Sequence, residues 1–226
     1  MGKVAIRRAS LKLVIFDMDG LMLDTEIVHF QTWMDYSKEY GFKYDIKKRL
    51  KYTGMTDESV IEELSNELGS RDKALEMRGK ILHARKEYFM HNSESLIKNG
   101  LLELLKYLDE KSIQKVVASS SGRGRLEFLL RKEGLLGRFD HIITKEDVSE
   151  GKPNPEIFLK AYEKYDFDKK ECLILEDSQN GYLAAKNSGL PYMIVPDSSF
   201  CFHNLTVDNT YKDLYEVKEF IENNFI

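Results

Sequence analysis

Two aspartates separated by one residue are the first feature of the sequence that suggests chemistry. Asp17 and Asp19 follow the apolar run Leu11–Phe16, and Gly20 comes directly after them. In an extended chain, side chains two positions apart lie on the same side, and a glycine allows the backbone to turn sharply. Two neighbouring carboxylates can divide the work, because one stays ionised as a nucleophile or metal ligand while the other carries a proton. A solvated turn or a fragment of a calcium-binding loop would explain the pattern equally well.

Small hydroxyl side chains follow a second apolar run. Ser119, Ser120 and Ser121 come at the end of the segment that begins at Gln114. Hydroxyls and backbone N–H groups near the start of a helix could hold a phosphate group. Taken alone, the serines are explained more simply as a helix cap.

A lysine lies in a loop that two prolines stiffen. Lys152 is followed by Pro153, and Pro155 comes two residues later, in the first turn of an expected helix. A lysine held in such a loop could neutralise both a nucleophilic carboxylate and a phosphoryl group. A solvated lysine is the alternative, and it is the common case in loops.

Two adjacent acids end a further apolar run, Glu171–Glu176. Glu176 and Asp177, together with Asp17 and Asp19, supply the oxygen ligands that Mg²⁺ prefers. Asp177 could also cap the helix that follows it. That role would not prevent metal binding, because a carboxylate has two oxygens.

The elements that must position these residues are short strands alternating with helices. The apolar runs have the length and β-branched content of buried strands, and two more occur at His141–Thr144 and Pro191–Pro196. Amphipathic stretches lie between most of them, most plainly where leucine recurs at helical spacing: Leu101, Leu104, Leu105 and Leu108. This alternation predicts an α/β fold with a parallel sheet wrapped by helices. Ligands of such sheets bind at the carboxyl ends of the strands, where the candidate residues fall.

One interval, residues 26–95, breaks the alternation. It contains no convincing strand, and its polar, Glu/Lys-rich stretches predict helices at about 27–40, 57–68 and 71–91. We therefore expect a small all-helical insert at 26–95 after the first strand, with a core formed by 1–25 and 96–226. Within the insert, Lys51–Asp57 lies between helical patterns. A final helix at Asp213–Asn223 is expected to pack on the sheet.

The composition excludes several classes of protein. The chain has 226 residues, and its 34 basic residues, spread along the sequence, stand against 38 acidic ones. This balance argues against nucleic-acid binding. The N-terminal residues Lys3, Arg7 and Arg8 precede an apolar run too short for a signal peptide or a membrane span. Cys172 and Cys201 show no metal or disulfide spacing, so we expect buried thiols and a cytoplasmic protein.

The four groups of candidate residues resemble the motifs of the haloacid dehalogenase superfamily of phosphohydrolases. The similar segments are FDMDGLMLDTE (Phe16–Glu26), VVASSS (Val116–Ser121), GKPNPEIF (Gly151–Phe158) and LILEDSQNG (Leu173–Gly181). The sequence is most similar to the branch that contains β-phosphoglucomutase and small-metabolite phosphatases. The resemblance implies a Rossmann-like core with a helical cap.

The resemblance also implies roles for the candidate residues. Asp17 would be the nucleophile that becomes aspartyl phosphate, and Asp19 the general acid and base, which also gives a backbone carbonyl to Mg²⁺. The phosphoryl group would be bound by Ser119, with Ser120 beside it, and by Lys152. Asp177, helped by Glu176, would complete the metal site. The insert would act as a lid over the substrate.

The expected function is hydrolysis of a sugar phosphate or nucleoside-derived monophosphate. We expect a monomer whose partner is such a small metabolite, with neither nucleic acid nor membrane as a partner. His29 and Trp33 lie on one face of the first insert helix and could line the substrate pocket. Core packing of Trp33 and a surface position of His29 explain them equally well.

Two other functions compete with this expectation. A sugar-phosphate mutase would need a cation in the insert, where the mutases carry an arginine and this chain has Asp57. An acidic side chain would repel a second phosphate, unless Arg49 or Lys51 replaced the missing cation. A phospho-receiver signalling domain is disfavoured by the length, the insert and Asp19.

Overall fold

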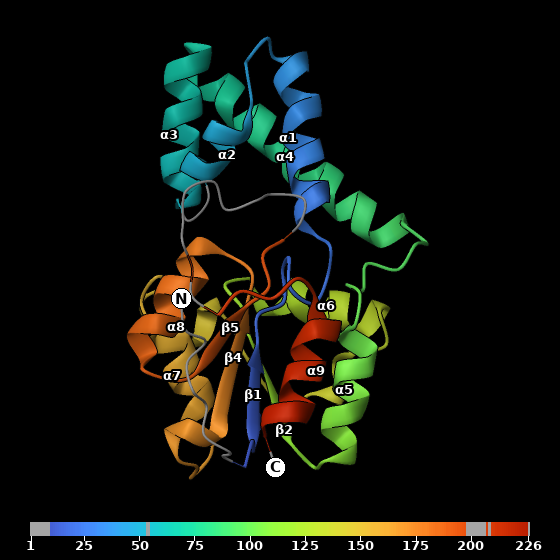
Figure 1. Ribbon diagram of the computed structural model, residues 1–226. Helices are drawn as coiled ribbons and strands as arrows, with labels where there is room; N and C mark the ends of the chain where they lie inside the picture. The colour runs from blue at the N-terminus through green and yellow to red at the C-terminus, as the bar shows by residue number, and fades with distance from the viewer. Residues whose placement is uncertain (1–9, 53–54, 198–206, 208, 226) are drawn as a thin grey trace. The chain divides into compact units, whose positions relative to one another are not determined.

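A parallel sheet lies at the centre of the larger part of the molecule (Figure 1). The computed structural model describes residues 10–52, 55–197, 207 and 209–225. Within these residues the sheet has five strands in the order β3-β2-β1-β4-β5. Their bounds are Leu13–Phe16 (β1), Gln114–Ala118 (β2), His141–Ile143 (β3), Cys172–Glu176 (β4) and Tyr192–Ile194 (β5). The predicted fold class is confirmed, and each strand lies within two residues of its expected bounds.

The central strand is buried completely. Every residue of β1 is buried, and Leu13 is in register with Gln114 of β2 on one side and with Cys172 of β4 on the other. Since parallel strands run in one direction, the residues that follow β1, β2 and β4 all emerge at the same edge of the sheet. This edge carries the candidate residues.

Helices cover both faces of the sheet, with α7 and α8 on one face and α5 and α9 on the other (Figure 1). The four leucines that predicted a helix at 101–108 are fully buried in α5. The helices of this part of the chain are α5 (Leu101–Glu110), α6 (Arg123–Lys132), α7 (Glu156–Tyr162), α8 (Gln179–Ser188) and α9 (Leu214–Asn224). Short 3₁₀ turns lie at Leu136–Arg138, Lys145–Asp147 and Lys169–Glu171.

The chain divides into two compact units. The core unit comprises Met1–Asp24 and Ser95–Ile226, and the helical unit comprises Thr25–Glu94. The helical unit contains α1 (Glu26–Glu39), α2 (Ile46–Tyr52), α3 (Asp57–Leu68) and α4 (Arg71–His91). The sequence predicted α1, α3 and α4, and the short α2 was not given bounds. Residues 53–54 of the segment Lys51–Asp57 lie outside the described residues.

The helical unit has its own hydrophobic core. Leu64, Met77 and Ile81 are fully buried there, and Trp33 packs among the aromatic rings of the unit. The ring centroids of Trp33 and Tyr44 lie 5.1 Å apart, and the two rings are nearly parallel. A core of this kind allows the unit to hold its shape through its own packing.

The segments that enter and leave the helical unit are paired. Leu23 forms an isolated antiparallel bridge with Ile97, and the N–H of Asp24 donates to the carbonyl of Leu96 at 2.7 Å. The chain therefore leaves the core unit and returns to it at the same place.

Two remaining expectations concern cysteines and membranes. Cys172 is a buried free thiol in β4, as expected. Cys201 lies outside the described residues, as do Lys3, Arg7 and Arg8. Among the described residues, none of the helices combines the length and apolar content that crossing a membrane requires.

Candidate active site

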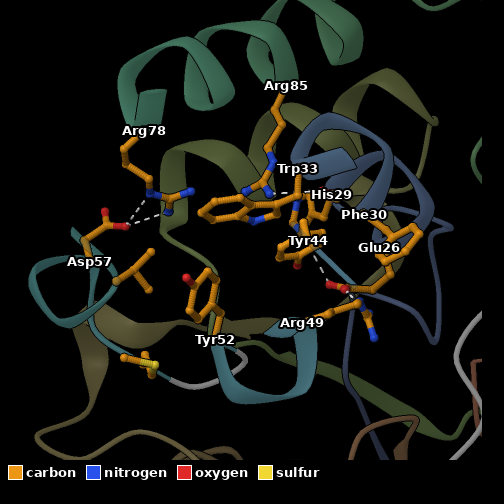
Figure 2. A pocket seen from close by; sticks show the side chains of 12 residues that line it. Glu26, His29, Phe30, Trp33, Tyr44, Arg49, Tyr52, Asp57, Arg78 and Arg85 are labelled. Atoms are coloured by element: carbon orange, nitrogen blue, oxygen red, sulfur yellow. Dashed lines mark hydrogen bonds and ion pairs between the residues drawn. The ribbon is translucent and has the colours of Figure 1, made fainter. Parts of the chain in front are cut away.

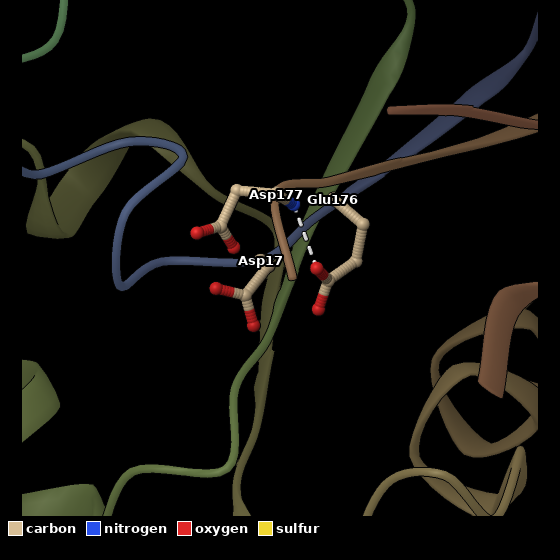
Figure 3. A group of neighbouring side chains, drawn as sticks. All are labelled: Asp17, Glu176 and Asp177. Atoms are coloured by element: carbon tan, nitrogen blue, oxygen red, sulfur yellow. Dashed lines mark hydrogen bonds between the residues drawn. The ribbon is translucent and has the colours of Figure 1, made fainter. Parts of the chain in front are cut away.

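Three carboxylates meet at the carboxyl edge of the sheet. Asp17 follows β1, Glu176 ends β4, and Asp177 comes next; each is buried. One oxygen from each lies within 4.8 Å of the others (Figure 3). The sheet register produces this cluster, because Phe16 is level with Leu175. Of the predicted metal ligands, the structure brings these three side chains together.

Lys152 joins two of these carboxylates. Its Nζ donates to Asp17 Oδ1 at 2.5 Å and to Glu176 Oε1 at 2.6 Å, and its side chain is 5% exposed. The loop that carries it is fixed by Glu156, which accepts hydrogen bonds from the backbone N–H groups of Ser149 and Glu150. The lysine predicted from the sequence is therefore built into the site and not solvated.

Glu176 accepts hydrogen bonds from both Lys152 and the backbone that follows β4. Its Oε2 accepts from the backbone N–H groups of Asp177 at 2.6 Å and Ser178 at 2.7 Å, while its Oε1 accepts from Lys152. Both oxygens of this carboxylate are thus occupied by protein donors. Glu176 holds Lys152 in place beside Asp17.

Burial sets the protonation of the cluster. It raises the pKa of the Asp17 carboxyl to about 8, although the ammonium of Lys152 opposes this rise. Burial lowers the pKa of Lys152, but the carboxylates of Asp17 and Glu176 outweigh it and the net pKa is raised. Because Lys152 lies between two carboxylates, its contact with Glu176 keeps it charged even when Asp17 carries a proton.

Two glycines make room for the carboxylates. A Cβ on Gly20 would lie 2.1 Å from Asp177 Oδ2, and Gly20 also has φ of +84°, which side-chain-bearing residues rarely adopt. A Cβ on Gly181, in the first turn of α8, would lie 1.8 Å from the Glu176 carboxyl carbon. Any side chain at these two positions would overlap a carboxylate of the site.

The alternative explanation of Asp177 as a helix cap is wrong. The N-cap of α8 is Ser178, whose hydroxyl accepts from the N–H of Gly181 at 3.1 Å. Since Ser178 serves the helix, the cap does not require the buried carboxylate of Asp177. This leaves the side chain of Asp177 in the acidic cluster.

The serines after β2 are not a helix cap either. Gly122 is the N-cap of α6, and no side chain caps it. Ser119 is buried, and its Oγ accepts from the N–H of Ser121 at 3.1 Å. The N–H of Ser119 donates to the carbonyl of Ile143, so this amide is already bonded. Ser120 is exposed.

Asp19 is held by a residue that the sequence did not single out. Arg125 of α6 donates to both carboxylate oxygens of Asp19, at 2.9 and 2.8 Å. Ser121 Oγ donates to Asp19 Oδ2 at 2.6 Å. The side chain of Asp19 is thus turned to a cation and a hydroxyl, and it is not part of the acidic cluster. No local pattern marks Arg125, because it lies 106 residues from its partner.

The acidic cluster suits a hard divalent cation. Its oxygens belong to three buried carboxylates, which carry more negative charge than Lys152 alone can balance. Carboxylate oxygens are the ligands that Mg²⁺ takes in proteins. The residues present therefore fit a metal of this kind.

Asp57 of the helical unit is ion-paired, which corrects the expectation of a repulsive carboxylate. Arg78 Nη2 lies 2.6 Å from Asp57 Oδ1. Arg49 is paired with Glu26, and Lys51 with Glu63. Asp57 therefore gives no reason to reject a mutase. Of the two residues on α1, Trp33 is buried in the unit's core and half-buried His29 lines a cavity beside it.

Comparison with known proteins agrees with the resemblance. The chain is 29% identical to a phosphorylated carbohydrates phosphatase of Thermotoga maritima, over 80% of this chain and 82% of that protein. It is 27% identical to the β-phosphoglucomutase of Bacillus subtilis, over 80% of this chain and 81% of that protein.

Solved structures and a family model extend this likeness. CbbY from Rhodobacter sphaeroides, in complex with phosphate, has a TM-score of 0.72 and 21% identity, over 92% of this chain and 96% of that chain. At this identity the likeness concerns the fold. The model of the haloacid dehalogenase-like hydrolases matches residues 14–195, which include Asp17, Lys152 and Asp177. With four fifths of its length inside that match, this chain belongs to the haloacid dehalogenase-like hydrolases.

Proposed function

We propose that the protein is a Mg²⁺-dependent phosphatase that hydrolyses a small phosphorylated metabolite through an aspartyl phosphate on Asp17. The enzyme class follows from its family and from relatives named phosphatases, such as those of Thermotoga maritima and Arabidopsis thaliana. The contact of Lys152 with Asp17 beside two further carboxylates carries the proposal. It supplies a nucleophile, a cation and metal ligands in one place.

In the proposed reaction, an oxygen of Asp17 attacks phosphorus and the bond from phosphorus to the alcohol oxygen breaks. Asp19 donates its proton to that oxygen. Asp19 then takes a proton from the water that attacks the aspartyl phosphate, which releases inorganic phosphate and restores Asp17. Lys152 and the Ser119 hydroxyl bind phosphoryl oxygens and reduce the repulsion between phosphate and carboxylate.

The metal would be held by Asp17, Asp177 and the backbone carbonyl of Asp19, with Glu176 beside them. When bound, it would screen the negative charges of the phosphate and the carboxylates from one another. Arg125 and Ser121 position the carboxylate of Asp19. We further propose that the helical unit is the cap of this enzyme. We also propose that the enzyme acts as a monomer in the cytoplasm.

Release of phosphate from p-nitrophenyl phosphate tests this function. We expect sustained release with Mg²⁺, loss of release with EDTA, and loss in Asp17→Asn, whose amide cannot form the acyl phosphate. Mass spectrometry of acid-quenched protein should find the phosphoryl group on the peptide that contains Asp17. Undiminished turnover after either treatment would contradict the mechanism. A single turnover per protein would indicate a phospho-receiver instead.

A further inference from the structure

The strand β5 also places a carboxylate at the edge of the sheet that holds the acidic cluster. Asp197 follows the end of β5 at Ile194, and its side chain is buried. The backbone fixes this segment, because the N–H of Val195 donates to the carbonyl of Glu176 at 2.8 Å. Since β5 is parallel to β4, the residues that follow the two strands emerge at the same edge.

Asp197 and Asp177 approach the same glycine. A Cβ added to Gly20 would lie 2.1 Å from Asp177 Oδ2 and 3.4 Å from Asp197 Oδ2. Among the described residues, Asp197 is nevertheless not part of the acidic cluster, whose oxygens all lie within 4.8 Å of one another. It therefore adds a buried negative charge beside the candidate metal site without belonging to the set of ligands.

Lys98 partly balances this charge. Its Nζ donates to Asp197 Oδ1 at 3.2 Å and lies 3.9 Å from Asp24 Oδ1. The backbone N–H of Lys98 donates to the carbonyl of Met22 at 2.9 Å, which fixes the lysine beside the segment that follows Gly20. The side chains of Lys98 and Asp197 are 19% and 5% exposed, so solvent screens this pair less than it screens a surface ion pair.

The two charges act on a bound cation in opposite senses. The carboxylate of Asp197 attracts a cation held by Asp177, and the ammonium of Lys98 repels it. One oxygen of Asp197 approaches Gly20 beside Asp177, and the other accepts from Lys98. The attraction therefore acts at shorter range than the repulsion. Both interactions are twice as strong for a divalent cation as for a monovalent one.

We propose that Asp197 raises the affinity of the candidate metal site for a divalent cation through its charge, without being a ligand, and that Lys98 moderates this effect. The inference rests on the metal site of the proposed function and adds two residues of the core unit to it. A charge outside the set of ligands strengthens cation binding and leaves coordination positions for phosphate oxygens.

Calorimetric titration of the full-length, substrate-free protein with Mg²⁺ at constant pH measures this effect. Asp197→Asn keeps an oxygen acceptor for Lys98 but removes the charge, and it should weaken binding about tenfold. Lys98→Met removes the repulsive charge and should strengthen binding about two- to threefold. A purely structural role of the pair would weaken binding in both variants. Urea unfolding shows whether each variant is folded, and Lys98→Met tests the charge independently if Asp197→Asn does not fold.

A second cation and a control variant separate charge from coordination. Because a charge acts on every divalent cation, the ratio of parent to Asp197→Asn affinity should be the same for Mg²⁺ and Ca²⁺. Loss of a ligand would change the two affinities differently, since Ca²⁺ accepts more oxygen ligands and a looser geometry than Mg²⁺. Asp57→Asn also removes a carboxylate from an ion pair, with Arg78 in the helical unit (Figure 2). That side chain is 63% exposed, so solvent screens its charge and the affinity for Mg²⁺ should not change.

The outcomes distinguish this inference from the proposed function. If the parent binds Mg²⁺ and Asp197→Asn binds it equally well, the inference is wrong and the metal site stands. A loss of affinity in Lys98→Met as large as in Asp197→Asn, or a ratio that differs between Mg²⁺ and Ca²⁺, would also overturn the inference. If the parent binds neither cation, the metal site of the proposed function is wrong, and this inference is wrong with it.

Discussion

The protonation of Asp17 links the candidate metal site to pH. Its pKa is raised to about 8 by burial, so the metal-free site holds a proton there at neutral pH. A divalent cation bound by this carboxylate must displace that proton. Metal binding and proton release are therefore one event at this residue.

We predict that the apparent affinity for Mg²⁺ rises by up to about tenfold per pH unit as the pH approaches the raised pKa, and levels off above it. Calorimetric titrations at pH 6, 7 and 8, in buffers with different heats of ionisation, measure both affinity and proton release. Equal affinity at pH 6 and pH 8 would show that Asp17 is already ionised without metal.

The raised pKa of Asp17 also determines how the stability of the metal-free protein depends on pH. The folded pKa of about 8 lies above the ordinary value of 3.8, so the native state binds this proton more tightly than the unfolded chain. Its contribution to stability is complete below about pH 4 and is lost as the pH rises towards 8. Urea unfolding in EDTA should show this loss in the parent but not in Asp17→Asn. If the stabilities of the parent and of Asp17→Asn changed with pH in the same way, the raised pKa of Asp17 would be contradicted.

We predict that Arg125 affects catalysis through the carboxylate of Asp19. Arg125→Gln removes both hydrogen bonds to the carboxylate, and we expect a loss smaller than the roughly 10²–10⁴-fold loss of Asp19→Asn. In both variants the loss should be smaller for p-nitrophenyl phosphate than for an alkyl phosphate, whose leaving group needs a proton. Arg123→Gln is the matched control, since Arg123 lies on the same helix as Arg125 but pairs with Asp147 of the 3₁₀ turn Lys145–Asp147. Equal losses with both substrates would argue for a purely structural role.

The start of α8 shows how the sequence of a helix is fitted to the site. Gly181 is a poor helix former, and alanine would stabilise an ordinary helix by up to about 1 kcal/mol. Here the added methyl would displace the Glu176 carboxylate that holds Lys152. We predict that Gly181→Ala lowers kcat/KM by about 10²-fold. Gly124→Ala in α6 should leave activity unchanged, because a Cβ added there would lie more than 4 Å from every atom outside its own stretch of helix. Full activity in Gly181→Ala would mean that Glu176 does not position Lys152.

The strands were predictable because each is a short buried run that ends in polar residues. The helix α2 was harder, since IKKRLKY is short and strongly basic, although Asp45 caps it by accepting from the N–H groups of Lys47 and Lys48. The shared sheet edge brought the candidate residues together, but the individual partners of side chains on distant helices could not be derived. Periodicity places Arg125 on α6, and Arg78 on α4, but it does not show which carboxylate each would meet. The resemblance gave Asp17, Lys152 and Asp177 their roles, and those roles stay predictions that the observed cluster supports.

For the whole molecule, the choice between phosphatase and mutase is the main functional question. Asp57 no longer decides it, because Arg78 balances its charge. We predict that β-glucose 1-phosphate yields inorganic phosphate faster than it yields glucose 6-phosphate, with no need for a bisphosphate activator. Coupled assays for the two products measure this ratio. Interconversion that far outpaces phosphate release would identify a mutase.

The paired segments at Leu23 and Ile97 have a consequence for folding. Closing a loop costs conformational entropy that grows with its length, and the 70 residues of Thr25–Glu94 form a long loop. Its two ends, however, are already joined by the hydrogen bond from Asp24 to Leu96. A chain in which a short Gly/Ser turn replaces residues 25–94 should therefore fold cooperatively, with a lower closure cost than the parent, and retain amide protection in β1 and β4. If it collapses without protected strands, the helical unit is required for the sheet to form, and the protein is one cooperative folding unit rather than two.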